Sequence, residues 1–189
     1  MTRGSWLGFA VAGLVAIGAA HAQETGGWNQ YKPGTWTHTR TTSVTDAPGM
    51  KIEAMVESRT TLKEVSAAES TVEVETTTTS KMNGVETKLP PQSNIMKIPN
   101  PVAGAVAPAA SPAPGAQGAA QGEETVTVGG KSYKCKTSKL STPAGGATVT
   151  AKTWFSDTVP GALVKSESTT EGETKSTIIT ELVDFEIKK

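Results

Sequence analysis

The sequence Met50-Lys-Ile-Glu-Ala-Met-Val-Glu57 decides the fold, because apolar side chains occupy every second position in it. A period of two predicts a β-strand with one apolar face. Thr71-Val-Glu-Val-Glu-Thr-Thr-Thr-Thr79 alternates in the same way and soon reaches Asn83-Gly84, a strong hairpin-turn signal. We expect Val85–Leu89 to be the returning strand, which Pro90-Pro91 would end.

Further strands are predicted on both sides of this hairpin. They cover Gly34–Val44, Glu124–Val128, Lys131–Leu140, Thr148–Phe155, Ala162–Thr170 and Glu173–Ile187. Gly129-Gly130 is a hairpin pattern, and Pro160-Gly161 has the order found at the centre of a type II turn. Short turns between successive strands favour an antiparallel meander of about eight or nine strands.

The predicted fold class is therefore mainly β, with the meander forming a curved sheet or half-barrel. The 29 threonines suit a pleated surface that is half solvated, since threonine is β-branched. Little helix is expected: Leu62–Glu69 is the only short candidate, and it fits the continuation of a strand equally well.

Two segments stand apart from the predicted sheet. Residues 1–22 combine Arg3, the apolar run Trp6–Ala20 and the cleavage pattern Ala20-His21-Ala22, which predicts a signal peptide and a secreted or periplasmic protein. No integral membrane segment is then expected in the mature chain, residues 23–189, which we interpret as a single β domain. Residues 99–122 are rich in Ala, Pro and Gly and carry no charge, so we expect a flexible, disordered connector within that domain. Separation of two domains is the alternative.

The charge balance gives no reason to expect nucleic acid as a partner. Arg3 is one of the 18 basic residues, so 17 basic and 18 acidic residues remain in the mature chain, for a net charge of about −1. A nucleic-acid-binding domain is typically basic, with its lysines and arginines gathered on one face. A solvated, nearly neutral surface is the expected result.

Few residues in the sequence are suited to catalysis or to metal binding. His38 is the only histidine of the mature chain, and no second titratable group is fixed beside it by sequence. Cys135 is the only cysteine, so a structural zinc site lacks ligands. We expect no catalytic residue, no metal and no cofactor. Cys135 is interpreted as a buried thiol, with an intermolecular disulfide and a nucleophile as the alternatives.

The most distinctive segment is Trp154-Phe-Ser-Asp-Thr-Val-Pro-Gly-Ala-Leu-Val-Lys-Ser-Glu-Ser168, in which two aromatic residues precede a turn and a second strand. With Tyr31-Lys-Pro-Gly-Thr-Trp36, it resembles the hairpins of uncharacterised secreted bacterial β-proteins and of the LolA/LppX-like lipoprotein-carrier half-barrels. The resemblance implies a curved antiparallel sheet around a hydrophobic cavity that carries acyl chains. Trp154 and Phe155 should point to opposite faces of their strand.

In the last predicted strand, Ile179, Val183, Phe185 and Ile187 should share a face with Glu181, while Ile178 and Leu182 lie opposite. The leading hypothesis is a secreted, non-enzymatic domain that binds an apolar or amphiphilic, lipid-like small molecule on its concave face. The alternative is a cell-envelope structural or protein-interaction module, whose partner is an envelope protein. The candidate ligand-lining residues are Ile52, Val56, Val72, Val74, Trp154, Phe155, Val183, Phe185 and Ile187.

Overall fold

The computed structural model describes residues 27–100, 117–144 and 146–188. The predicted signal peptide, residues 1–22, and residues 101–116 of the predicted connector lie outside these described residues. Within them the expected fold class is confirmed, because the chain forms one antiparallel sheet with almost no helix. The one helical segment in the described ranges is the 3-10 turn η1 (Trp28–Gln30), which the sequence did not predict. No helix there is long and apolar enough to cross a membrane.

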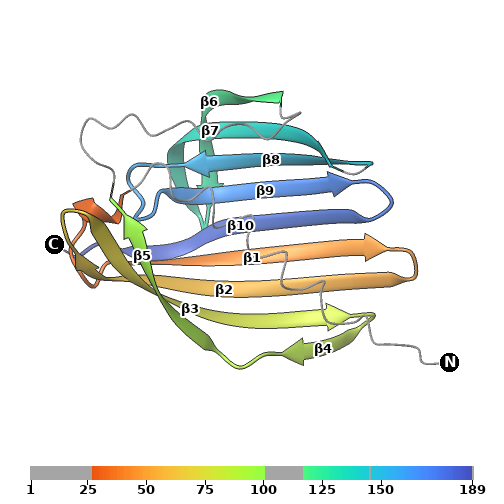
Figure 1. The fold of residues 1–189 in the computed structure, drawn as a ribbon, viewed down its shortest axis with the longest axis horizontal. Helices are drawn as coiled ribbons and strands as arrows, with labels where there is room; N and C mark the ends of the chain where they lie inside the picture. The colour runs from red at the N-terminus through yellow and green to blue at the C-terminus, as the bar shows by residue number, and fades with distance from the viewer. Residues whose placement is uncertain (1–26, 101–116, 145, 189) are drawn as a thin grey trace.

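Ten strands build the sheet (Figure 1). They are β1 (Trp36–Ala47), β2 (Met50–Val65), β3 (Glu69–Met82), β4 (Val85–Lys88), β5 (Gln92–Pro99), β6 (Gln117–Val128), β7 (Lys131–Ala144), β8 (Ala147–Phe155), β9 (Leu163–Glu171) and β10 (Lys175–Glu186). Their order in space is β4-β3-β2-β1-β10-β9-β8-β7-β6, and β5 also pairs with β3. Among the described strands, β6 ends the sheet on one side, and β4 and β5 end it on the other.

The middle of the sheet is formed by the first and last strands. β1 pairs with β10 from Trp36 opposite Glu186 to Asp46 opposite Lys175, and it pairs with β2 on its other side. The predicted meander is present within β1–β4 and within β6–β10, and the β1–β10 ladder joins these two runs. The parts of the chain before and after residues 101–116 therefore share one sheet.

The predicted turns are confirmed by the backbone. Asn83 and Gly84 have φ of 48° and 89°, and Gly129 and Gly130 have φ of 56° and 76°. Two successive residues in the left-handed region define the type I′ turn that two-residue hairpins favour. At Pro160-Gly161, the Ala162 N–H donates to the Val159 carbonyl at 2.8 Å and closes the expected turn.

One strand was not predicted, and one predicted boundary was wrong. β4 ends at Lys88, before Pro90-Pro91 as expected, but β5, which follows these prolines and pairs with β3, was not expected. β6 begins at Gln117, so residues 117–122 of the predicted connector are strand, and Pro99 of the connector ends β5. At Leu62–Glu69 the strand interpretation is correct, since β2 continues to Val65 and β3 starts at Glu69.

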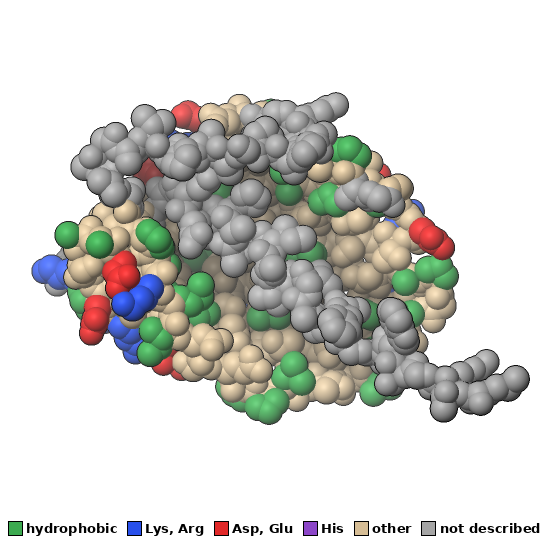
Figure 2. Space-filling view, viewed as in Figure 1, with side chains coloured by type: hydrophobic (Ala, Val, Ile, Leu, Met, Phe, Trp, Pro, Cys, Tyr) green, Lys and Arg blue, Asp and Glu red, His purple; other side chains and the backbone are tan. Residues whose placement is uncertain are grey.

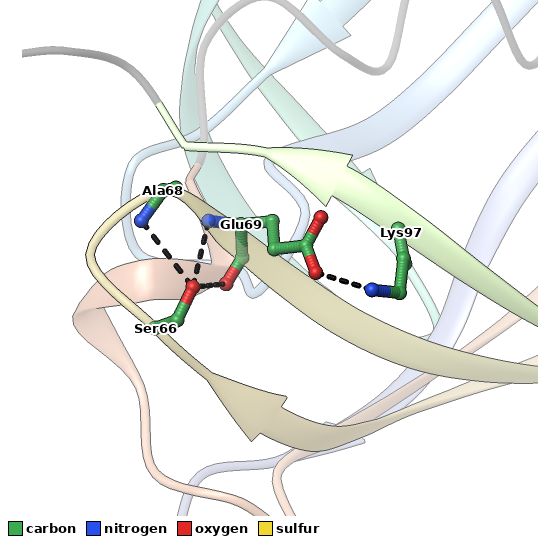
Figure 3. A network of polar contacts seen from close by, with 4 residues as sticks. All are labelled: Ser66, Ala68, Glu69 and Lys97. Atoms are coloured by element: carbon green, nitrogen blue, oxygen red, sulfur yellow. Dashed lines mark hydrogen bonds and ion pairs between the residues drawn. The ribbon is translucent and has the colours of Figure 1, made fainter.

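A polar network holds the turn between β2 and β3 (Figure 3). The Ser66 hydroxyl accepts hydrogen bonds from the backbone N–H groups of Ala68 at 3.3 Å and Glu69 at 3.0 Å. The Glu69 carboxylate in turn pairs with Lys97 of β5 at 2.5 Å. The buried Asn100 side chain donates to the Ser66 carbonyl at 2.8 Å, so the end of β5 is fixed to this turn.

Two hydrophobic clusters form the core. The first packs Trp28 of η1 on Leu62 of β2 and Val72 of β3. The second gathers buried side chains from the other half of the sheet, with Tyr133 and Phe185 at its border; its members are Val128, Cys135, Trp154, Val159, Val164 and Leu182. Trp28 also lies against Gly161, where an added Cβ would come within 3.2 Å of the indole. The η1 segment therefore contacts both halves of the sheet.

Candidate functional site

The strand register separates the charged residues from the uncharged ones. On one face of the sheet, the side chains described on β1–β3 and β9, on β8 as far as Thr153, on β10 as far as Leu182 and on β7 from Ser138 to Thr142 are Ser, Thr, Ala, Val, Ile, Leu or Met; Lys136 and Lys134 continue this face of β7 beyond Ser138. We call this the uncharged face and define it by Thr37, Thr39, Thr41, Ser43, Thr45, Met50, Ile52, Ala54, Val56, Ser58, Thr60, Leu62, Ser70, Val72, Val74, Thr76, Thr78, Ser80, Met82, Ser138, Leu140, Thr142, Val149, Ala151, Thr153, Ser166, Ser168, Thr170, Ser176, Ile178, Thr180 and Leu182. The sheet therefore presents a broad surface that has no ionic character.

The opposite face, the charged face, carries ion pairs across the strands. The Arg40 guanidinium lies 2.7 Å from the Glu57 carboxylate, and its hydrogen bond lowers the pKa of Glu57. Lys165 lies 2.9 Å from Glu167 and 3.2 Å from Glu181. Because alternate residues of a strand point to opposite faces, these charges are held away from the uncharged face.

Figure 2 shows the uncharged face as seen in Figure 1. Where its described atoms are visible, this face shows mainly hydrophobic and uncharged polar side chains, while Lys, Arg, Asp and Glu appear at its left end and along its rim. Apolar side chains are more exposed toward the β4 edge, where Met82 is 47% exposed and Val85 is 70% exposed. Exposed apolar side chains that are grouped in this way are typical of an interaction site.

Hydroxyl groups are paired across the middle of the uncharged face. The Thr41 and Thr180 hydroxyl oxygens lie 2.9 Å apart, and those of Thr45 and Ser176 lie 3.2 Å apart. A hydroxyl pair that shares one hydrogen bond still has one donor and several acceptor positions available. The half-buried side chains of Ile52, Val56 and Ile178 stand beside these pairs in the register. The surface is thus able to make both apolar contacts and neutral hydrogen bonds.

Four of the predicted lining residues lie together on this face. Ile52 and Val56 are half-buried on β2, and the half-buried Val74 is on β3 opposite Thr60, where it packs against the Trp28 cluster. Val72 shares the face, but it is only 1% exposed because Trp28 covers it. Val72 therefore belongs to the core, and the three others remain available to line a site.

The aromatic pair and the C-terminal candidates are placed elsewhere. Trp154 is buried, and its indole N–H donates to Glu124 at 2.9 Å, whereas Phe155 lines a cleft beside β6 and β7. Ile187 follows the end of β10 and is 41% exposed. The structure does not bring these three residues to the middle of the uncharged face.

The predicted face of the last strand needs a correction. Ile179 and Glu181 lie on the charged face, opposite Thr42 and Arg40, but Phe185 pairs with Thr37 of the uncharged face. A register shift at Val183, between Leu182 and Asp184, reverses the alternation. The residue that a β-bulge adds changes which side chains share a face, so counting by two fails beyond it.

Two clefts lie outside the uncharged face. The larger, of about 470 Å³, is lined by residues of β6, β7 and the end of β8, including Glu123, Lys134, Lys136, Phe155 and Asp157. Lys136 and Asp157 pair in it at 3.0 Å. The smaller, of about 280 Å³, lies over the charged face beside His38, Glu57 and Arg59. Both clefts are lined by charges of both signs.

His38 is part of the ionic network of the charged face. Its Nε2 lies 3.4 Å from Glu57, the same carboxylate that Arg40 holds. A carboxylate already paired with a guanidinium is a weak partner for a general base. Among the residues that the structure describes, no group of three or more His, Cys, Asp or Glu side chains is arranged to hold a metal ion.

Cys135 lies in the second hydrophobic cluster and is 3% exposed. Burial raises the pKa of its thiol, and the nearby Glu124 carboxylate raises it further. Both effects disfavour the thiolate, which is the reactive form of cysteine. The geometry therefore favours the interpretation of Cys135 as a buried thiol.

We expect the Cys135 thiol to resist alkylation in the folded protein. Iodoacetamide at pH 8 should modify it at least about 100-fold more slowly than in urea-unfolded protein, because both access and thiolate formation are suppressed. Mass spectrometry of timed samples measures both rates. Equal rates in the two states, or a dimer that reductant dissolves, would contradict this expectation.

Sequence reasoning found part of the uncharged face and missed its extent. The alternation in residues 50–57 placed Lys51, Glu53 and Glu57 away from Ile52 and Val56, as observed. The threonines of β1 gave no such signal, since both faces of that strand carry them. Their assignment needed the pairing of β1 with β2 and β10. Comparison with known proteins adds no relative, because no family model, no curated protein and no solved structure matches this chain.

Proposed function

We propose that this protein binds an apolar or amphiphilic small molecule on the uncharged face of its sheet. The supporting observation is the separation of charges in the middle of the sheet: β1–β3, β9 and β10 as far as Leu182 bear ion pairs on one face and only Ser, Thr and aliphatic or Met side chains on the other. A solvated antiparallel sheet has no need to exclude every charge from a face unless that face meets something other than water. The role is non-enzymatic in this proposal, as a carrier or a sensor of the bound molecule.

The proposal includes the compartment. The signal peptide predicted for residues 1–22 would direct the mature chain, starting at Gln23, to a periplasmic or extracellular space. Amphiphilic molecules that cross such a space need an apolar surface to bind. Amino-terminal sequencing of the protein recovered from that space checks the cleavage position.

Native mass spectrometry of residues 23–189, purified without detergent, tests the binding function. We expect a reproducible additional mass that organic extraction removes. Val56→Glu should abolish it, because the variant places a charge on the uncharged face. Met55→Glu is the matched control. Met55 neighbours Val56 in the sequence but lies on the charged face, where it is 40% exposed. The Met55→Glu variant should therefore keep the additional ligand mass. An apoprotein mass for the unaltered chain, with no uptake of added amphiphile, would refute the proposal.

The alternative function, contact with an envelope protein, has one observation in its favour. Large hydrophobic side chains are exposed at one sheet edge, on β3, β4, β5 and the segment between them: Met82, Val85, Leu89, Ile95 and Met96. An edge strand can pair with an extended segment of another protein. Ile95, at 72% exposure, is the residue to change: Ile95→Lys should abolish co-purification of a protein partner and leave ligand uptake intact.

A further inference from the structure

We infer that the molecule bound on the uncharged face is electrically neutral: an alkyl chain joined to a head group of hydroxyl, ether or ester oxygens. This inference rests on the proposed binding function and specifies its ligand class. It excludes fatty-acid anions, anionic phospholipids and cationic amphiphiles as preferred ligands of this face.

The first step concerns the counter-ion that a charged head group would need. On β1–β3 and β8–β10 the lysines and arginines are on the other face by register, and Lys165 is held there by Glu167 and Glu181. Lys136 and Lys134 continue the Ser138 face only on β7, toward the far edge of the sheet, where Lys136 is held by Asp157. Lys152 is likewise paired with Glu124 at 2.6 Å. A charge that leaves water for an apolar surface without a partner loses several kcal/mol. An ionic head group on this face would carry that full penalty.

The second step concerns what the face offers instead. The Thr41–Thr180 and Thr45–Ser176 pairs lie four residues apart along each strand of the β1–β10 ladder, with Ser43 opposite Ile178 between them. Alternate residues of a strand are separated by about 6.6 Å, and neighbouring strands by about 4.8 Å. The two pairs are therefore about 13 Å apart along the strands, and Ser43 places a further hydroxyl on the same face between them. Neutral oxygens bind such hydroxyls without any ionic partner.

The third step concerns the alkyl chain. Ile52, Val56 and Ile178 stand among the hydroxyls, and the face continues to the exposed Met82 and Val85 near the β4 edge. Each methylene group that leaves water on such a surface strengthens binding. The hydroxyl pairs in the middle and the aliphatic side chains toward the edge match the two parts of a neutral amphiphile.

The larger cleft beside β6 and β7 is where a charged head group would find partners. Lys134 and Lys136 line it, although Glu123 and Asp157 line it too, and Lys136 is already paired with Asp157. The opposing charges there nearly cancel, so the cleft has little net attraction for an anion. Preference for an anion through this cleft is the competing outcome that the experiment must detect.

Three probes with the same dodecyl-type tail decide the question. Titration calorimetry below the micelle concentration compares monododecanoylglycerol (neutral), dodecanoate (anionic) and dodecyltrimethylammonium (cationic). We expect the neutral probe to bind the mature chain at least about tenfold more tightly than either ion. Ser43→Lys should raise the affinity for dodecanoate and lower that for the cation, because it places an ammonium on the uncharged face. Thr42→Lys, on the charged face, is the matched control and should leave the ranking unchanged.

The outcomes separate the ligand class from the binding function. Equal affinities for the three probes, or tightest binding of either ion, would overturn the inference and leave the proposed function standing. Dodecanoate binding that Lys136→Gln abolishes would assign the head group to the cleft, and would also overturn it. If none of the probes binds, the proposed function itself fails. Urea unfolding of each variant verifies that it is folded. If Ser43→Lys does not fold, the order of the three affinities measured on the unaltered chain still decides whether the ligand is neutral.

Discussion

Trp154→Ala is expected to destabilise the protein by about 3–5 kcal/mol, the range for truncating a buried large aromatic side chain. Trp154 is 6% exposed and packs in the second hydrophobic cluster with Cys135, Val164 and Leu182. Its indole N–H also donates to Glu124 at 2.9 Å, and this bond helps to lower the pKa of that carboxylate. The variant loses the packing and the hydrogen bond together.

Trp36→Ala is the matched control, since Trp36 has the same kinds of polar contacts with less burial. Its indole N–H donates to Glu186 at 2.9 Å, and the Arg59 guanidinium lies 4.1 Å from its ring centroid. Trp36 is half-buried on the charged face, so we expect its removal to cost about 1 kcal/mol. Urea unfolding followed by far-ultraviolet circular dichroism measures both variants. Similar losses for the two would show that the polar contacts, rather than burial, set the contribution of these tryptophans.

Thr180→Pro is expected to lower the free energy of unfolding by about 3 kcal/mol or more. In a domain of typical stability, this loss should remove the cooperative unfolding transition. Thr180 is in β10, between Thr41 of β1 and Ser166 of β9. Proline has no N–H, so the substitution removes a ladder hydrogen bond. The carbonyl left unpaired inside the sheet lowers the free energy of unfolding by about 1–3 kcal/mol. The proline ring also clashes with the neighbouring strand.

Two further variants isolate the cause. Thr180→Val keeps the β-branched shape and removes only the hydroxyl, so it should cost about 1 kcal/mol. Glu86→Pro places proline on the edge strand β4. The Leu89 N–H donates to Thr78, and by the alternation of an antiparallel pair the N–H of Glu86 then points away from β3. That variant should lose less than about 1 kcal/mol. A large loss for Glu86→Pro would show that proline is harmful regardless of the strand's place in the sheet.

Local patterns were sufficient to predict most strands of the fold. The alternation of apolar and polar residues identified β2 and β3, and Asn83-Gly84 identified the hairpin between β3 and β4. Both signals arise from residues that are close together in the sequence. The pairing of β1 with β10 has no local signal: its partners are far apart in sequence, and threonine-rich strands specify register weakly. β5 was missed because proline is compatible with an edge position, which sequence alone does not identify.

The candidate site was predictable only where the alternation was unbroken. Ile52, Val56 and Val74 lie on regular stretches of β2 and β3, and they reached one face as expected. Phe185 and Val183 lie at or beyond a register shift, and Trp154 and Phe155 flank another, between β8 and β9. Such irregularities depend on how three strands fit together, so no count along a single strand finds them.

The adjacency of β1 and β10 also sets the order in which the molecule can form. Residues of β1, such as Thr41, pair with residues of β10, such as Thr180, which lies 139 positions later in the sequence. A topology with so many distant contacts folds slowly, since a long loop must close before any of these contacts stabilises it. Until β10 has been synthesised, β1 and β9 both lack their inner neighbour. Among the described strands, β10 is thus the one that completes the middle of the sheet, by joining β1 to β9.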